Sequence, residues 1–293
     1  MAKIESVDAV PVTGGFFFDD QQAIKQGATR DGFDYAGEPV TDGFDRVRQP
    51  AEALSVVVTL SSGQVAVGDC ASVQYAGAGS RDHVFRAEQY RETVTEDIAP
   101  LVEGRDAADF ETNVAELAAL DGSLHTAVRY GVSQAVLDAA SKARHVTMTD
   151  VLASMYDSDP ATEPIPLYTQ SGDRRRANSE KMILKGVDRF PHGLFNNVEK
   201  VGENGERLTE FVSWLARRVD EIGPSEYEPT FHVDVYGTIG DIFGPPYDRS
   251  EVTAVFDELE TAAGEYDLQL EGDRKSTRLN SSHITRSRMP SSA

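Results

Sequence analysis

The stretch FHVDVYGTIG, residues 231–240, carries the clearest fold signal in the chain. In an extended strand, His232, Asp234 and Tyr236 lie on one face, and the two valines between them lie on the other. A strand with one apolar and one polar face is typical of a (β/α) barrel whose active site lies at the C-terminal strand ends. Asp234 is then an inward carboxylate, although an isolated strand aspartate equally often caps a helix or pairs with a cation.

A second strand ending in a carboxylate follows in LQLEG, residues 268–272. Its leucines alternate with Gln269 and Glu271, so Glu271 shares the polar face and stands at the strand end. Two carboxylates at the ends of successive strands suit a hard, oxygen-seeking cation such as magnesium. Acidic strand ends are common in an acidic protein, so the pair alone leaves the metal site open.

Two other polar residues are candidates for the same barrel mouth. Gln170 ends a predicted strand in YTQSGD, and His192 precedes the next predicted strand in FPHGLFNNV. A lone loop histidine is more often a surface or core residue, and an exposed glutamine usually has no special role. Cys70 is interpreted as a buried small side chain rather than a nucleophile, because nothing nearby would lower its pKa.

Working outward from these motifs, the second half of the chain alternates strands and helices with short connections, which predicts βα repetition. The acidic, proline-rich residues 157–166 are interpreted as the linker before it. The expected strands are 167–171, 194–198, 230–236 and 268–271, and the expected helices lie near 177–186, 205–222 and 250–264.

The first half of the chain is typical of an α+β domain. Residues 4–12 predict a strand, and residues 54–60 and 64–69 alternate around a Ser-Gly turn as a β-hairpin does. Residues 14–50 predict a long ordered loop, because glycines and aspartates interrupt any periodicity. Apolar side chains at helical spacing follow, including those of residues 128–139. We therefore expect an N-terminal domain over residues 1–160 and the first half of a barrel over residues 161–272.

Composition narrows the functional classes. The 293 residues carry 49 acidic and 28 basic side chains, a net charge of −21. Nucleic acid is excluded as a partner because it needs a basic footprint, and no apolar run is long enough for a membrane span. The single cysteine fits a reducing compartment, so we expect a cytoplasmic protein. Scarce lysine and high acidity favour a halophilic source, with an acidic mesophilic enzyme as the alternative.

The last 21 residues, 273–293, differ in character from the rest. They are basic and lack any periodic apolar face, which predicts disorder. The letters DRKSTRLNSSH and RSRMPSSA are similar to the translation of a common short-read sequencing adapter. We therefore expect a non-native tail and a natural coding sequence that continues past Gly272.

Several long blocks, in order from Lys3 to Gly272, resemble the 3-methylaspartate ammonia-lyase family of the enolase superfamily. The blocks are GGFFFDDQQAIKQGA, TDGFDRVRQ, GDCASVQYAGAGSRD, LHTAVRYGVSQAVLDA, QSGD, PHGLFNNVE, FHVDVYGTIG and LQLEG. The resemblance implies an α+β capping domain followed by a TIM-type, enolase-like (β/α) barrel, here incomplete.

The resemblance also implies roles for individual residues. Asp234 and Glu271 match two of three magnesium ligands, and His192 matches the histidine that faces the substrate opposite the principal base. Gln170 matches a contact to a substrate carboxylate, and Gln74 lies in a capping-domain loop that approaches the amine pocket. The family's lysine base, in a Gln-x-Lys pair, and its third metal-binding aspartate belong beyond Glu271, so we expect this chain to be inactive as written.

The implied reaction eliminates ammonia from 3-methylaspartate, a small amino acid, to give mesaconate. It needs Mg²⁺ to stabilise charge next to the proton that is removed, with K⁺ as an activator. The full-length parent is expected to be a homodimer. Two alternatives stay open: another enolase-superfamily lyase or dehydratase, and a non-catalytic binding protein derived from that fold.

Overall fold

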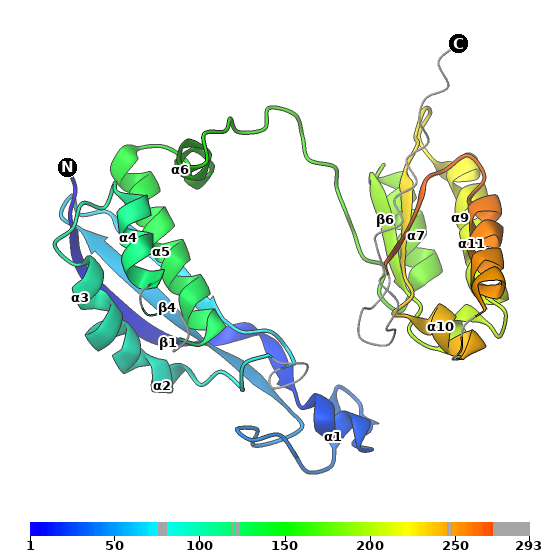
Figure 1. The fold of residues 1–293 in the computed structure, drawn as a ribbon, viewed down its shortest axis with the longest axis horizontal. Coiled ribbons are helices and arrows are strands. Elements are labelled where there is room, and N and C mark those ends of the chain that lie inside the picture. The colour runs from blue at the N-terminus through cyan, green and yellow to red at the C-terminus, as the bar shows by residue number, and fades with distance from the viewer. Residues whose placement is uncertain (76–80, 119, 121–123, 245, 247, 272–293) are drawn as a thin grey trace. The chain divides into compact units, whose positions relative to one another are not determined.

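The chain divides into two compact units, Met1–Thr162 and Glu163–Ala293 (Figure 1). The computed structural model describes residues 1–75, 81–118, 120, 124–244, 246 and 248–271. The predicted tail, 273–293, lies outside the described residues. No helix among the described residues is long and apolar enough to cross a membrane.

The first unit is built on a three-stranded antiparallel sheet with the order β1-β4-β5. Strand β1 (Ile4–Asp19) pairs with β4 (Arg48–Leu60), which forms a hairpin with β5 (Val65–Ala71). Alternate residues of β4 are buried, as a half-covered sheet requires. The predicted hairpin is therefore confirmed.

Strand β1 is longer than predicted, and the predicted loop over residues 14–50 is only partly a loop. A register shift between Thr13 and Phe17 lets β1 continue past two glycines. Glycines weaken a strand signal, but a β-bulge absorbs them without ending the pairing. The rest of the segment contains α1 (Gln21–Lys25), β2 (Thr29–Asp31) and β3 (Asp34–Ala36).

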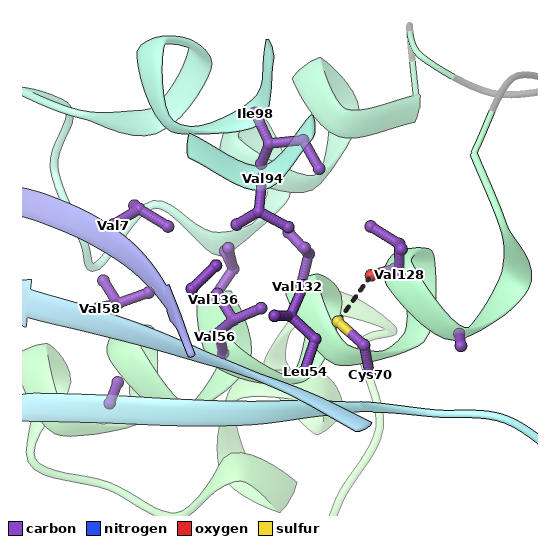
Figure 2. Close-up of a cluster of buried hydrophobic side chains, with 14 of the residues drawn as sticks. Val7, Leu54, Val56, Val58, Cys70, Val94, Ile98, Val128, Val132 and Val136 are labelled. Carbon is purple, nitrogen blue, oxygen red and sulfur yellow. Dashed lines mark hydrogen bonds between the residues drawn. The ribbon is translucent and has the colours of Figure 1, made fainter. Parts of the chain in front are cut away.

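Helices cover one face of the β1-β4-β5 sheet and form the core of this unit with it (Figures 1 and 2). Figure 2 shows apolar side chains from the sheet, such as Val56, meeting Val94 and Val132 from the helices. The helical segments are α2 (Ala87–Glu92), a π-helix (Thr93–Ile98), α3 (Ala99–Val102), α4 (Phe110–Ala118), α5 (Thr126–Arg144) and α6 (Met148–Met155).

Two glycines set the close packing of α5 on β5. A Cβ atom at Gly131 would lie 2.4 Å from the backbone nitrogen of Cys70, and one at Gly68 would lie 2.1 Å from the carbonyl oxygen of Gly131. The helix and the strand therefore touch backbone to backbone. Burial raises the pKa of the Cys70 thiol to about 12, as expected of a buried cysteine that is no nucleophile.

The second unit is built on a three-stranded parallel sheet with the order β6-β7-β8. Its strands are β6 (Arg189–Leu194), β7 (Thr230–Asp234) and β8 (Leu268–Glu271), and helices connect them. Parallel strands need such crossovers, so the predicted βα repetition is confirmed. The helices are α7 (Arg175–Leu184), α8 (Val198–Val201), α9 (Glu206–Ile222), α10 (Thr238–Phe243) and α11 (Arg249–Ala263).

Two predicted strands of this unit need correction. The strand expected at 194–198 lies earlier, as β6, and α8 begins at Val198. Pro191 and Gly193 hid it, because both residues read as strand breakers and a bulge between them interrupts the alternation. The strand expected at 167–171 is reduced to one parallel bridge, Tyr168 to Arg189. Backbone hydrogen bonds still hold that extended segment beside β6.

Candidate active site

The C-terminal ends of the three parallel strands meet at one edge of the sheet. Asp234 and Glu271 end β7 and β8 and are direct neighbours in the strand register. The backbone nitrogen of Val235 donates a hydrogen bond to the carbonyl oxygen of Glu271, which ties the two strand ends together. The two predicted carboxylate residues are therefore adjacent, with Asp234 buried and the Glu271 side chain 53% exposed.

A tight turn fixes the Asp234 carboxylate. Its Oδ1 atom accepts a hydrogen bond of 3.0 Å from the backbone nitrogen of Tyr236. Tyr236 and Gly237 have positive φ angles, 52° and 77°, so the chain reverses immediately after the strand and enters α10. The local sequence Asp-Val-Tyr-Gly thus orients the carboxylate, because glycine accepts a left-handed conformation at no steric cost.

A β-bulge brings His192 to the same edge. Pro191 pairs with His232 and Gly193 pairs with Val233, so His192 is the extra residue of β6. Its ring stacks on that of His232 with centroids 5.1 Å apart, and their Nδ1 atoms lie 3.1 Å from each other. One ring donates this hydrogen bond and the other accepts it. His192 was predicted in a loop before the strand; the structure places it within β6.

Glu271 lies next to both imidazoles. Its Oε2 atom is 3.6 Å from Nδ1 of His192 and 3.7 Å from Nε2 of His232. Burial, and next the neighbouring charge of His192, lower the pKa of His232, while Glu271 opposes that shift. His232 is therefore a neutral imidazole at pH 7, able to accept or donate a proton through either nitrogen.

Tyr168 completes the cluster from the extended segment. Its ring packs edge-on against His192 and His232, with centroid distances of 5.5 and 5.3 Å. Burial, and then the charges of Glu271 and Asp234, raise the pKa of its phenol. Both carboxylates thus act electrostatically on one hydroxyl group, which stays protonated at neutral pH.

Gln170 is exposed two residues after Tyr168, and Ser171 follows it with a backbone hydrogen bond to Pro191. The extended segment therefore brings Gln170 to the side of β6, near the bulge. Sequence reasoning gave no role to His232 or Tyr168. His232 could have been found from the sequence, because it shares a strand face with Asp234. The only signal for Tyr168 was its position two residues before Gln170.

Gln74 belongs to the first unit, where a buried ion pair holds it. Arg48 binds Asp19 through two hydrogen bonds of 2.7 and 2.8 Å, and both side chains are at most 10% exposed. Asp19 in turn accepts a hydrogen bond of 2.6 Å from the Gln74 side-chain nitrogen. A carboxylate only accepts, so the Gln74 amide is oriented with its nitrogen toward Asp19 and its oxygen directed elsewhere.

The donors at the strand ends suit magnesium in part. Mg²⁺ binds through one or two carboxylates and keeps several waters, and the adjacent strand ends of Asp234 and Glu271 supply two carboxylates. The exposure of Glu271 leaves room for water or substrate oxygens. The two imidazoles beside Glu271 are softer donors and are no part of a typical magnesium shell.

Sequence profiles of one family match almost the whole chain. The profile described as "Methylaspartate ammonia-lyase N-terminus" matches residues 2–157, and the one described as "Methylaspartate ammonia-lyase C-terminus" matches residues 159–286. A methylaspartate ammonia-lyase from Haloarcula marismortui is 58% identical over 276 residues, which cover 92% of this chain. The match spans 65% of the Haloarcula protein, so this chain accounts for about that share of its relative's length.

Solved structures of methylaspartate ammonia-lyases also match this chain. A crystal structure of the magnesium complex of β-methylaspartase from Clostridium tetanomorphum is 45% identical and superposes with a TM-score of 0.84, covering 92% of this chain and 66% of that one. The methylaspartate ammonia-lyase from Citrobacter amalonaticus containing (2S,3S)-3-methylaspartic acid is 47% identical, with a TM-score of 0.84 and coverages of 92% and 66%. The likeness confirms the predicted class, an α+β domain followed by the first strands of an enolase-like (β/α) barrel.

Proposed function

The chain belongs to the methylaspartate ammonia-lyase family, and from that premise we propose that it is the larger part of a magnesium-dependent carbon–nitrogen lyase. The proposed reaction removes ammonia from L-threo-3-methylaspartate to give mesaconate. The observation that carries the proposal is the pair of neighbouring carboxylates, Asp234 and Glu271, beside the imidazole of His192.

In this proposal Asp234 and Glu271 hold the metal. A bound magnesium ion supplies the Lewis-acid charge that stabilises a carboxylate next to an acidic C–H bond. Asp234 is suited to the task because the turn to Tyr236 fixes its orientation before any ligand arrives. The exposed Glu271 side chain is free to exchange its histidine contacts for a metal contact.

His192 faces the substrate and assists the proton transfer, as the family resemblance implies. Its contact with His232 keeps one ring nitrogen engaged, so the second ring sets which nitrogen of His192 carries a proton. Gln170 is proposed to hold a substrate carboxylate through its amide nitrogen. These residues orient the substrate; the base that the family resemblance implies is a lysine further along the full-length protein.

Gln74 is proposed to contact the amine of the substrate. One N–H of its amide donates to Asp19, which fixes the orientation of the amide, and we propose that the carbonyl oxygen is the group that accepts a hydrogen bond from the ligand. An acceptor at that position suits an ammonium group and disfavours a carboxylate. The Asp19 and Arg48 side chains would then act through Gln74 by fixing its amide orientation.

The acidic composition supports the proposal that the enzyme works at high salt, and the single cysteine supports a cytoplasmic location. K⁺ as an activator and a homodimeric full-length protein are proposed from the family resemblance alone. The natural gene is proposed to continue past Gly272 with the lysine base and the third carboxylate ligand, in place of residues 273–293. Independent sequencing of the genomic DNA tests this, and a stop codon directly after Ala293 would contradict it.

The activity test uses the full-length protein, incubated with 3-methylaspartate and Mg²⁺ in low and in multimolar salt. Ultraviolet absorbance detects mesaconate. We expect turnover by the full-length protein and none by residues 1–293, because the latter lack the proposed base. Turnover of a different carboxylic acid in place of methylaspartate would indicate another lyase or dehydratase, and magnesium-independent ligand binding without turnover would indicate a binding protein.

A further inference from the structure

One donor from each parallel strand meets at the sheet edge. His192 on β6, His232 on β7 and Glu271 on β8 each place a ligand atom within 4.8 Å of the other two. Nδ1 of His192 lies 3.1 Å from Nδ1 of His232 and 3.6 Å from Oε2 of Glu271, and the 3.7 Å contact of His232 with Glu271 is made by its other ring nitrogen, Nε2. Four ligands at about 2.0 to 2.2 Å from a tetrahedral metal ion lie about 3.3 to 3.6 Å from each other. The two contacts of His192 Nδ1 are therefore close to the ligand spacing of a tetrahedral metal shell, and all three ligand atoms lie within 4.8 Å of one another.

We propose that these three side chains bind a divalent transition-metal ion of the zinc type, in a site that shares Glu271 with the proposed magnesium site. Two imidazoles and one carboxylate are the donor set of many open zinc sites, whereas magnesium prefers oxygen donors alone. The half-exposed Glu271 side chain leaves the fourth position open to water. The same strand edge thus offers two cations two different sets of ligands.

The imidazoles are held in place before any metal binds. Both histidine side chains are only 14% exposed, and the Tyr168 ring packs against both of them. The bulge fixes His192 beside His232 through the backbone pairing of β6 and β7. Little side-chain freedom is therefore lost on binding, which favours affinity.

Sharing of Glu271 has a direct consequence. An ion bound to His192 and His232 would draw Glu271 away from Asp234, so zinc and magnesium would exclude each other. Among divalent ions, zinc binds nitrogen donors far more tightly than magnesium does. We expect traces of zinc to occupy the edge even when magnesium is in large excess.

The test is a titration of the 293-residue chain with Co²⁺, whose visible absorption reports tetrahedral coordination, followed by displacement with Zn²⁺. We expect one ion per chain, a tetrahedral spectrum and no displacement by a large excess of Mg²⁺. Because binding is read out directly, the result does not depend on lyase activity. An octahedral spectrum, or displacement by an equal concentration of Mg²⁺, would overturn the proposal.

Three variants locate the ion. His232→Ala and Glu271→Gln should each weaken binding at least about tenfold, the smaller effect known for loss of even an outer-shell partner. His145→Ala should bind as the parent does, because His145 is an exposed helix cap of the first unit. Circular dichroism checks folding, and if His232→Ala is unfolded the exposed Glu271→Gln decides. Unchanged affinity in Glu271→Gln would show that the ion binds elsewhere.

Discussion

The polar clusters at the two sheets of this protein differ in the length of their contacts and in their burial. In the first unit, Arg48, Asp19 and Gln74 form hydrogen bonds of 2.6 to 2.8 Å, and the ion pair is almost fully buried. In the second unit, Glu271 lies 3.6 and 3.7 Å from two imidazoles and is half exposed. The side chains of the first cluster make short hydrogen bonds to one another. The contacts of Glu271 in the second cluster are longer and leave room for another atom between the side chains.

The difference follows from strand direction. Antiparallel strands return at each turn, so their polar ends are covered by local loops such as the one that carries Phe33, whose carbonyl oxygen accepts a hydrogen bond from Arg48. Parallel strands all end at one edge, so their polar ends converge on a shared opening. The well-bonded cluster of the first unit therefore fixes the orientation of its side chains, including the amide of Gln74, and the loose cluster of the second unit leaves space for a bound ion.

The largest effect should be on stability, when the cation of the buried Arg48–Asp19 pair is removed. Arg48→Ala leaves the Asp19 carboxylate buried without its cation, and we expect a loss of about 3 to 5 kcal/mol in the stability of the first unit. Arg46→Ala is the matched control, because Arg46 pairs with Asp34 on the surface and its loss should cost under about 1 kcal/mol. Hydrogen exchange of the β1 and β4 amides in urea measures both. Equal effects would refute the claim that the buried Arg48–Asp19 pair stabilises the first unit more than the surface pair of Arg46 and Asp34 does.

The second largest effect should be on the catalytic rate, through the carboxylates at the strand ends of the second unit. In the full-length protein, Asp234→Asn removes a proposed metal ligand, and we expect the rate of mesaconate formation to fall about 100-fold to 1000-fold. The stability of the fold should change little. Asp241→Asn, an exposed aspartate of α10 close in sequence, serves as the control and should keep the parent rate. Wild-type turnover in Asp234→Asn would exclude this carboxylate from the reaction.

A third test asks whether backbone contact stabilises the first unit. Alanine normally stabilises a helix relative to glycine by about 1 kcal/mol. Gly131→Ala should nevertheless destabilise by about 1 to 3 kcal/mol, because its methyl group would overlap the backbone at Cys70. Gly15→Ala has no atom within 4 Å of the added methyl group and should be close to neutral. Thermal unfolding compares the two, and a stabilised Gly131→Ala would show that α5 can move away from β5.

The smallest effect is a pH dependence in the first unit. Burial raises the pKa of Asp20, but hydrogen bonds from Thr41, Val40 and Ala23 outweigh it, so the pKa lies below its ordinary value of 3.8. The stabilisation is therefore present above pH 3.8 and is lost as the pH falls through the lower, folded-state pKa. Asp20→Asn should be less stable at pH 7 and less sensitive to acid, whereas the exposed Asp8→Asn should follow the parent. Parallel acid-unfolding curves for Asp20→Asn and the parent would contradict this.

Much of this structure could be predicted from regular patterns. Helix α9 and strand β8 were predicted almost to the residue, because a long apolar stripe and a short strict alternation each fit one period only. The hairpin of β4 and β5 was predicted for the same reason. The predicted position of β6 was wrong because Pro191 and Gly193 interrupt its alternation. In the folded protein, pairing with β7 forms the strand despite this local sequence.

The candidate site was less predictable than the fold. Residue patterns suggested Asp234 and Glu271 as neighbours, since successive parallel strands end at one edge, and the register has them paired. The proximity of His192 to His232 depends on the bulge, which no periodicity reveals. The orientation of Gln74 depends on Asp19, a residue 55 positions away in the chain, and such a contact exists only after folding.

The bulge in β6 also constrains where insertions and deletions can occur during evolution. Because one extra residue in 191–194 sets which side chains of β6 face the histidine of the next strand, a single-codon insertion or deletion there would exchange the two faces of the strand from that point on. Residues 158–166 carry no such register, since they are exposed and lie outside every helix and strand. Length variation among natural relatives should therefore accumulate in 158–166 and be almost absent from 191–194.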